Sequence, residues 1–353
     1  MHMADALISP AVGGTLWVVS GGLIAFCARK VKQTLRDNLV PMMGVLGAFI
    51  FAAQMINFSI PGTGSSGHLG GGLILTVLLG PYAAFLVIAS VLTVQAFFFA
   101  DGGLLALGCN IFNLGFFPAF VAYPLIYRIM AKDQHGTART WVAAIVAAVV
   151  GLLLGAFSVV LETKASGISD LPFRTFVLMM LPIHFAIGIV EGLVTAAVVS
   201  FVARARPEVL QTVSLAGAPV SLRPVLIGLA IAAAVTGGVA SWFASTYPDG
   251  LEWSIAKVTG KEEVSGSEAG VHKELAQLQE KTAFLPDYGF KSIEIEVKGT
   301  PAEETTPEPA PWPAVNAGTS VAGIVGGLMT LVLSGLVGFV LKARSMPCAG
   351  GAG

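Results

Sequence analysis

Charged residues are scarce in this sequence. Asp, Glu, Lys and Arg make up 12% of its 353 residues, whereas they make up about 25% of an average soluble domain. Hydrophobic residues account for 55%, and the 42 glycines suit helices that pack closely in lipid. The composition therefore excludes a soluble protein and predicts an all-α polytopic membrane protein.

Cysteine is also nearly absent. Cys27, Cys109 and Cys348 lie far apart without CxxC spacing, which excludes a disulfide framework and a thiolate metal site. The basic residues are spread among loops and the net charge is -1, so no nucleic-acid partner is expected. No candidate nucleophile stands out in the polar stretches, so we do not expect an enzyme.

The first residues, Met1-His2-Met3-Ala4-Asp5, carry no secretory signature, because they contain no basic region and no small-residue cleavage site. A histidine in second place brings three nitrogens within reach of one ion: the terminal amine, the His2 amide and its Nδ1. Amine and amide close a five-membered ring with the ion, and amide and Nδ1 close a six-membered ring. Three donors in one plane predict a square site, which suits Ni(II) or Cu(II).

The apolar runs predict nine membrane spans. Basic residues at 29–36 follow the first run and mark the cytoplasmic side, so we expect the N-terminus outside and the C-terminus inside. The run at 70–99 would form a helix of about 45 Å, too long for a bilayer core of about 30 Å, and Gly80-Pro81 can divide it. The expected spans are 12–28, 39–57, 70–79, 81–99, 104–127, 141–161, 175–203, 224–246 and 315–341.

A change in composition divides the chain into two units. Residues 1–205 form a seven-segment bundle, and a cytoplasmic linker follows at 206–223. Residues 224–345 form a two-span hairpin around an acidic outer loop at 247–312. Residues 254–312 are rich in proline and glutamate and cannot bury a core of their own, so we expect them to be partly disordered.

His68 is the candidate for the fourth nitrogen. It ends a loop rich in glycine and serine that should face the same outer side as Met1. Taken alone, His68 would be interpreted as an exposed loop histidine, and the position of His2 directly after the initiator methionine as a coincidence. Together they favour a metal site. The loop also has the GxxxxG spacing of a phosphate-binding loop. His68 and Leu69 replace the lysine and the serine or threonine that such a loop requires, so we exclude nucleotide binding.

Four further polar residues have two readings each. His184 and Glu191 share one face of a predicted span, where they could relay protons or simply bind a neighbouring helix. Asp5 could orient a metal-bound imidazole or be a solvated acid. Asn113 could support the same site or join two helices.

The opening Met-His-Met-Ala-Asp-Ala-Leu-Ile-Ser-Pro resembles the Met-His-Ile-Pro-Asp-Gly-Phe-Leu-Ser-Pro opening of the CbiM/NikM family. These proteins are the substrate-binding (S) components of energy-coupling factor (ECF) transporters for nickel and cobalt. The resemblance covers residues 1 to about 205, and further matching stretches lie at 62–71, 101–110 and 191–195. It departs from the commoner pattern at Ala4 and Ala6.

This resemblance implies that the ligands are the Met1 amine, the amide and imidazole nitrogens of His2, and the His68 imidazole. Residues 220–345 resemble the small NikN-type subunit, the PDGLE family, whose motif stands at 248–252. The chain thus resembles a natural fusion in which the second unit assists metal loading. The family resemblance also implies a transmembrane coupling (T) subunit and two ATPase subunits as partners.

We therefore expect the S component of an ECF-type ABC importer in a bacterial or archaeal cytoplasmic membrane. The transported ion is expected to be Ni(II), with Co(II) second, and no permanently bound cofactor is expected. The alternative is a proton-coupled secondary transporter of divalent metals that uses His184 and Glu191. Uptake driven by a pH gradient in vesicles containing only this chain would favour that alternative.

Overall fold

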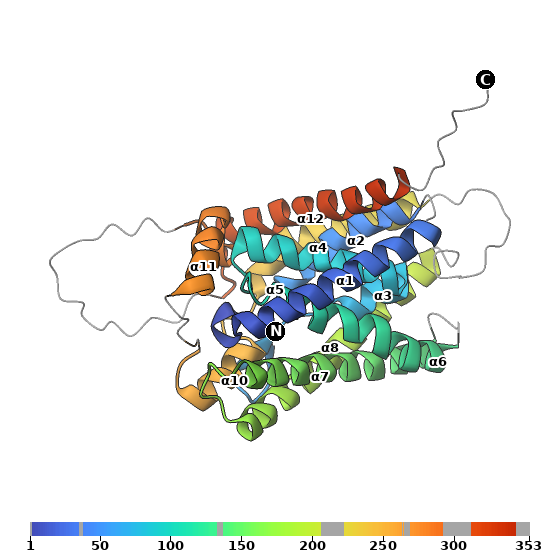
Figure 1. Ribbon diagram of the computed structural model, residues 1–353. Coiled ribbons are helices and arrows are strands. Elements are labelled where there is room, and N and C mark those ends of the chain that lie inside the picture. Colours follow the sequence, from blue (N-terminus) through green and yellow to red (C-terminus); the bar gives the residue numbers. More distant parts are fainter. Residues whose placement is uncertain are drawn as a thin grey trace.

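The computed structural model describes residues 2–34, 38–132, 137–205, 222–262, 264, 269–291 and 312–343. Met1 and nearly all of the predicted linker 206–223 lie outside the described residues. The described chain is helical almost throughout, with a single two-stranded hairpin, as expected for an all-α protein (Figure 1).

A helix stands at each of the nine positions where the sequence predicts a span. Two apolar helices are shorter, α2 (Leu39–Gln54) and α9 (Arg223–Gly238), and α3 (Gly72–Leu79) has eight residues. Six helical stretches are long and apolar enough to cross a membrane: α1 (Pro10–Thr34), α4 (Pro81–Phe99), the continuous stretch Leu107–Ala131, α7 (Ala138–Ser166), α8 (Phe173–Ala205) and α12 (Ala317–Ala343).

The division of residues 70–99 into two helices is confirmed. Helix α3 ends at Leu79, and Gly80 has a φ of 81°, a value that favours glycine. Pro81 then begins α4, where its missing N–H is no loss and its fixed φ suits a first turn. The two helices pack against each other.

The stretch Leu107–Ala131 departs from an ordinary α-helix. It begins as α5 (Leu107–Ile111), continues as a π-helical segment η2 (Phe112–Tyr127) and ends as α6 (Arg128–Ala131). Pro118 and Pro124 lie inside η2. A proline supplies no N–H and its ring displaces the preceding carbonyl, so it disturbs the α-helical pattern of hydrogen bonds. The sequence predicted a span here but not its wider turn.

The second unit packs on the first through close glycine contacts. Helix α12 lies against α2 and α4, and α9 lies against α2 and α12. A Cβ added to Gly326 of α12 would come within 2.0 Å of the Phe51 ring. Where α9 and α12 meet, a Cβ on Gly323 would lie 2.3 Å from the Gly237 oxygen. Side-chain-free surfaces of this kind let helices approach closely in a membrane.

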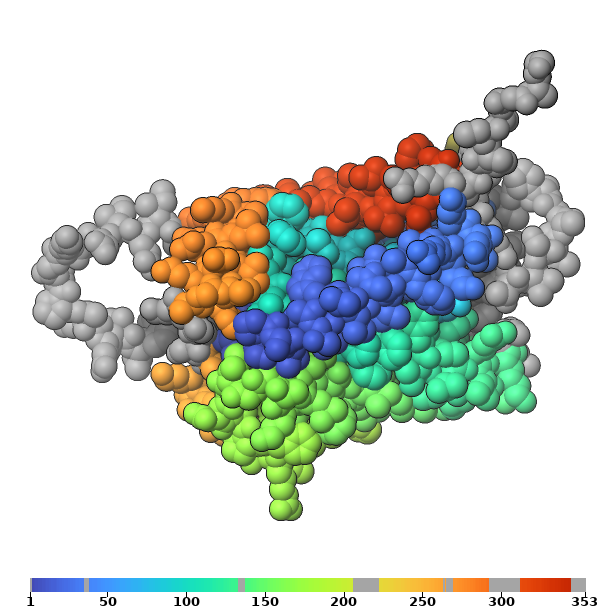
Figure 2. Space-filling view, viewed as in Figure 1, coloured from blue at the N-terminus to red at the C-terminus, as the bar shows by residue number. Residues whose placement is uncertain are grey.

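Two helices of the acidic outer loop cover the end of the bundle at which the chain begins (Figure 1; Figure 2, orange beside dark blue). These are α10 (Gly250–Thr259) and α11 (Gly270–Thr282). The stretch expected to be partly disordered therefore contains helical residues of α10 and α11, and its residues 292–311 lie outside the described residues. Helix α10 buries Leu251 and Ile255 beside α8, so the loop uses the core of the first unit instead of its own.

Candidate metal site

The N-terminal segment is bound to the start of α5. The Met3 amide donates to Asn110 Oδ1 at 2.8 Å, and Asn110 Nδ2 donates back to the Met3 carbonyl at 3.2 Å. Gly103 N donates to the same carbonyl at 2.9 Å. The Met3 side chain is fully buried. These contacts fix the backbone immediately after His2.

Asp5 secures the same segment from the other side. Its Oδ1 accepts from the Ala106 amide at 2.9 Å, and a Cβ on Gly103 would lie 1.9 Å from that oxygen. Burial raises the pKa of Asp5, while hydrogen bonds from the backbone of residues 104–106 lower it. The Asp5 carboxylate thus binds a loop, and neither imidazole is its partner.

The partner of the first imidazole is Asp101, which begins the family-like stretch 101–110 and for which the sequence predicts no specific role. His2 Nδ1 lies 2.8 Å from Asp101 Oδ1, and the His2 side chain is 6% exposed. Tyr288, in the short helix η5 (Pro286–Tyr288) of the second unit, donates to Asp101 Oδ2. Burial alone would raise the pKa of Asp101, but His2 and Tyr288 hold it at about 2.

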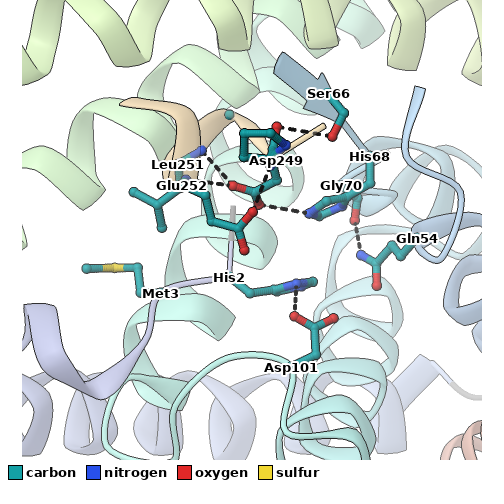
Figure 3. A network of polar contacts seen from close by, with 12 residues as sticks. His2, Met3, Gln54, Ser66, His68, Gly70, Asp101, Asp249, Leu251 and Glu252 are labelled. Carbon is teal, nitrogen blue, oxygen red and sulfur yellow. Dashed lines mark hydrogen bonds and ion pairs between the residues drawn. The ribbon is translucent and has the colours of Figure 1, made fainter. Parts of the chain in front are cut away.

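The loop of His68 is held by three other elements. Strands β1 (Phe58–Ile60) and β2 (Ser65–Gly67) pair antiparallel and lead directly into His68. The Gly70 amide donates to Glu191 Oε2 on α8 at 2.8 Å. The Gly70 carbonyl accepts from Gln54 Nε2 on α2 at 2.8 Å (Figure 3). Gln95 of α4 in turn donates to Gln54 at 2.9 Å.

A hydrogen bond to the backbone indicates which ring nitrogen of His68 carries the proton. Its Nδ1 lies 3.1 Å from the Leu69 carbonyl, which can only accept, so Nδ1 carries the proton and Nε2 the lone pair. Burial lowers the pKa of His68 to about 3, so the ring is neutral at physiological pH. The rings of His2 and His68 stack with centroids 4.9 Å apart and planes inclined by 16° (Figure 3).

The PDGLE motif closes the site from the second unit. Asp249 caps α10, with its Oδ1 accepting from the amides of Leu251 at 2.7 Å and Glu252 at 2.9 Å. The Asp249 amide donates to Glu252 Oε2 at 2.9 Å, which completes a capping box. Asp249 Oδ2 lies 3.9 Å from His68 Nε2.

A cavity of about 450 Å³ lies between the two units, and both imidazoles line it. No lysine or arginine is among its described lining residues. Its acidic lining residues are Asp5, Asp101, Asp249, Glu252, Glu262 and Asp287. Such a surface attracts cations.

The other predicted residues bond to groups other than the two imidazoles, although His184 lines a small pocket together with His68. Asn113 donates to Glu162 Oε2 at 2.8 Å and touches Met3 Sδ at 4.0 Å. His184 Nδ1 lies 2.8 Å from the Met180 carbonyl. Glu191 holds the loop of His68, as described above, and its part in a proton relay with His184 stays a prediction.

Within the described ranges, no three His, Cys, Asp or Glu side chains form a metal cluster.

Two family models match the chain. The model for the cobalt uptake substrate-specific transmembrane region, CbiM, matches residues 2–209, and the PDGLE domain model matches residues 223–343. The chain belongs to the CbiM family. This CbiM-family chain carries a PDGLE domain on the same polypeptide.

Relatives agree with this assignment. A protein of Archaeoglobus fulgidus that bears the name of a fused nickel transport protein, NikMN, is 32% identical over 333 residues, covering 94% of this chain and 96% of the relative. The cobalt transport protein CbiM of Geobacter sulfurreducens is 28% identical over 217 residues, covering 60% of this chain and 61% of the relative. The crystal structure of a truncated transition metal transporter matches with a TM-score of 0.52 and 28% identity, covering 58% of this chain and 99% of that one. This CbiM-family chain is a nickel or cobalt transport component and not an enzyme.

Proposed function

We propose that the chain is the substrate-specific component of an ECF-type importer and captures Ni(II) or Co(II) on the outer side of the membrane. The observation that carries this proposal is the stacking of the His2 and His68 rings, 4.9 Å apart, at the end of the bundle. The proposed ligands are the Met1 amine, the His2 amide nitrogen, His2 Nδ1 and His68 Nε2. Four nitrogens in a plane suit Ni(II) first and Co(II) second.

This chelate requires a rotation of the His2 ring, because Nδ1 now faces Asp101. A half-turn about the Cβ–Cγ bond exchanges Nε2 with Cε1, the ring atom next to Nδ1. Nε2 then lies on the side of the ring that faces the Asp101 carboxylate. Nδ1 is then available to the ion, and Asp101 accepts from Nε2 as the second-shell partner of a bound imidazole. Buried His2 Nε2 has no hydrogen-bond partner among the described residues, so the rotation would also satisfy that atom.

The remaining expectations follow from the same assignment. Residues 1–205 would form the metal-capture unit and residues 224–345 would assist loading, with the chain's beginning outside a bacterial or archaeal cytoplasmic membrane and its end inside. A coupling subunit and two ATPases would supply the energy for release. Support for this arrangement comes from the CbiM and PDGLE matches and from the residues of α10 and α11 that line the cavity.

The deciding experiment compares Ni(II) binding by the purified chain with and without one alanine added ahead of Met1. The extra residue moves the free amine out of the chelate. We expect a loss of affinity of more than about 100-fold, because changes to outer-shell partners alone typically cost 10–100-fold. Intact mass must first show that Met1 is retained.

An alanine added after Gly353 serves as the matched control and should bind Ni(II) as the native chain does. Equal affinity of the two extended chains would rule out the proposed ligand set.

A further inference from the structure

Tyr288 connects the second unit to the imidazole at the beginning of the chain. Its hydroxyl donates to Asp101 Oδ2. The other oxygen of the same carboxylate, Oδ1, lies 2.8 Å from His2 Nδ1 (Figure 3). Tyr288, Asp101 and His2 all line the acidic cavity. The three side chains therefore form one continuous series of contacts across the boundary between the two units.

The ring of Tyr288 is held by aromatic side chains of the first unit. It stacks on Phe99 of α4, with the two ring centroids 5.2 Å apart and the planes inclined by 20°. Phe51 of α2 meets it edge-on, at a centroid distance of 6.1 Å. Aromatic pairs in these arrangements attract each other beyond the area that they bury. Because Phe99 is the last residue of α4 and Asp101 follows shortly after it, ring and hydroxyl contact the same turn of the chain.

The backbone at Tyr288 has a conformation that residues with a side chain rarely adopt. Asp287 has a φ of 50° and Tyr288 a φ of 58°, both in the left-handed region. Such residues cost free energy and persist only where their surroundings hold them, which is common at functional sites. Leu285 N donates to the Phe98 carbonyl at 3.3 Å, so the segment before them is fixed to the end of α4. The strain is maintained at the residue whose hydroxyl reaches Asp101.

A neighbouring residue of the outer loop holds the backbone of the same turn. Gln279 Nε2, on α11, donates to the Ala96 carbonyl at 2.9 Å and to the Gly102 carbonyl at 2.8 Å. Gln279 therefore fixes the main chain on both sides of Asp101, and Tyr288 fixes the carboxylate itself.

Tyr288 is the donor in its contact with Asp101. Burial and, after it, the charge of Asp101 raise the pKa of the Tyr288 hydroxyl, so this group keeps its proton at neutral pH. A hydrogen bond from a neutral hydroxyl to a carboxylate is charge-assisted and stronger than one between two neutral groups. It binds one carboxylate oxygen and leaves the other to the imidazole.

The proposed chelate needs an oriented acceptor for the His2 ring. In that chelate Nδ1 binds the ion and Nε2 donates to Asp101. A carboxylate that is fixed in one orientation selects one position of the ring, whereas a mobile one does not. We propose that Tyr288 is a positioning residue of the metal site: it fixes Asp101, Asp101 orients the His2 imidazole, and the second unit thereby takes part in metal binding. This inference rests on the proposed function and adds to its metal site a residue that lies outside the first unit.

The test measures Ni(II) affinity of the full-length chain by competition with a coloured chelator. Tyr288→Phe keeps the ring that stacks on Phe99 and removes only the hydroxyl. We expect the affinity to fall about three- to tenfold, the usual effect of losing one hydrogen bond. Tyr247→Phe is the matched control, because Tyr247 belongs to the same outer loop and its side chain is exposed, and it should leave the affinity unchanged. Equal affinities of the two variants would overturn the inference.

Two further readouts separate positioning from a merely structural role. The visible absorption band of bound Ni(II) reports the arrangement of its nitrogen donors, so it should shift in Tyr288→Phe and stay in place in Tyr247→Phe. In an Asp101→Ala background, Tyr288→Phe should change the affinity less than about twofold, because the group that it positions is already gone. An unshifted band, or the full loss of affinity in the Asp101→Ala background, would show that Tyr288 does not act through Asp101.

The chain with one alanine ahead of Met1 separates this inference from the proposed function. If the extension leaves native affinity intact, the proposed ligand set fails. If the extension abolishes tight binding while Tyr288→Phe binds Ni(II) as the native chain does, only the role of Tyr288 fails.

Discussion

At the scale of single residues, each imidazole of the candidate site has a carboxylate from a different part of the chain. His2 faces Asp101 at 2.8 Å, and His68 faces Asp249 at 3.9 Å. The first pair is close enough to orient a ring by hydrogen bonding, and the second is not. The two acids should therefore act differently when they are replaced.

Asp101→Asn should weaken Ni(II) binding by about 10–100-fold, the usual cost of losing a second-shell partner of a metal-bound histidine. The amide offers a weaker acceptor to His2 and no longer carries the charge that Tyr288 stabilises. A competition assay with a coloured chelator measures the change. Asp170→Asn, at an exposed acid between α7 and α8, is the control and should leave affinity unchanged. Equal affinity of the two variants would contradict a role for Asp101.

His68 also predicts how stability varies with pH in the metal-free protein. Its folded pKa of about 3 lies below the value of 6.5 expected for an unfolded histidine. Between these two pKa values His68 binds a proton in the unfolded chain but not in the folded chain. The free energy of unfolding therefore falls as pH drops from about 6.5 towards 3. At pH 5 the loss is about 2 kcal/mol, at 1.36 kcal/mol per pKa unit.

His68→Gln does not titrate and should show a smaller drop in the thermal unfolding midpoint between pH 7 and pH 5 than the native chain. Identical drops would mean that His68 is not buried as a neutral ring.

At the scale of elements, the two units meet through backbone and ring contacts instead of long side chains. Gly326→Val should push α12 away from Phe51 and destabilise the protein by about 1–3 kcal/mol, as overpacking does. Gly335→Val lies on the same helix with no neighbouring atom within 4 Å and is the matched control. Thermal unfolding in detergent compares them, and equal midpoints would show that the contact contributes nothing.

Helix positions could be predicted from the sequence because their signals are local. Gly80-Pro81 breaks the run 70–99 by its own backbone preferences, and the structure ends α3 there. The pattern Asp249-x-x-Glu252 is a capping signal that could have located α10, although composition pointed to disorder. Asp101 opens the family-like stretch 101–110, but its contact with His2, about a hundred residues away in the chain, is not indicated by any local pattern. The π-helical turn of η2 was likewise missed, because prolines in a span predict disturbance but not its form.

At the scale of the whole molecule, the site and the helices α10 and α11 occupy one end, and α6 lies at the other (Figure 1). The expected topology puts the site end outside.

A cysteine at Asp170 should react with a membrane-impermeant maleimide in intact cells, whereas one at Lys132 should react only after lysis. Cys27 and Cys109 are buried and should stay silent. Cys348 lies outside the described residues and is replaced by serine in both variants. The reverse labelling pattern would invert the topology.

One polypeptide carries both the histidines and the helices that cover them. A cover encoded as a separate subunit would have to be synthesised in matching amount and to find its partner in the bilayer. Here α12 rests on α2 and α4, and α10 rests on α8, within a single chain. Each candidate site is therefore synthesised together with one copy of the helices that cover it, at any level of expression, and dilution in the membrane cannot separate them.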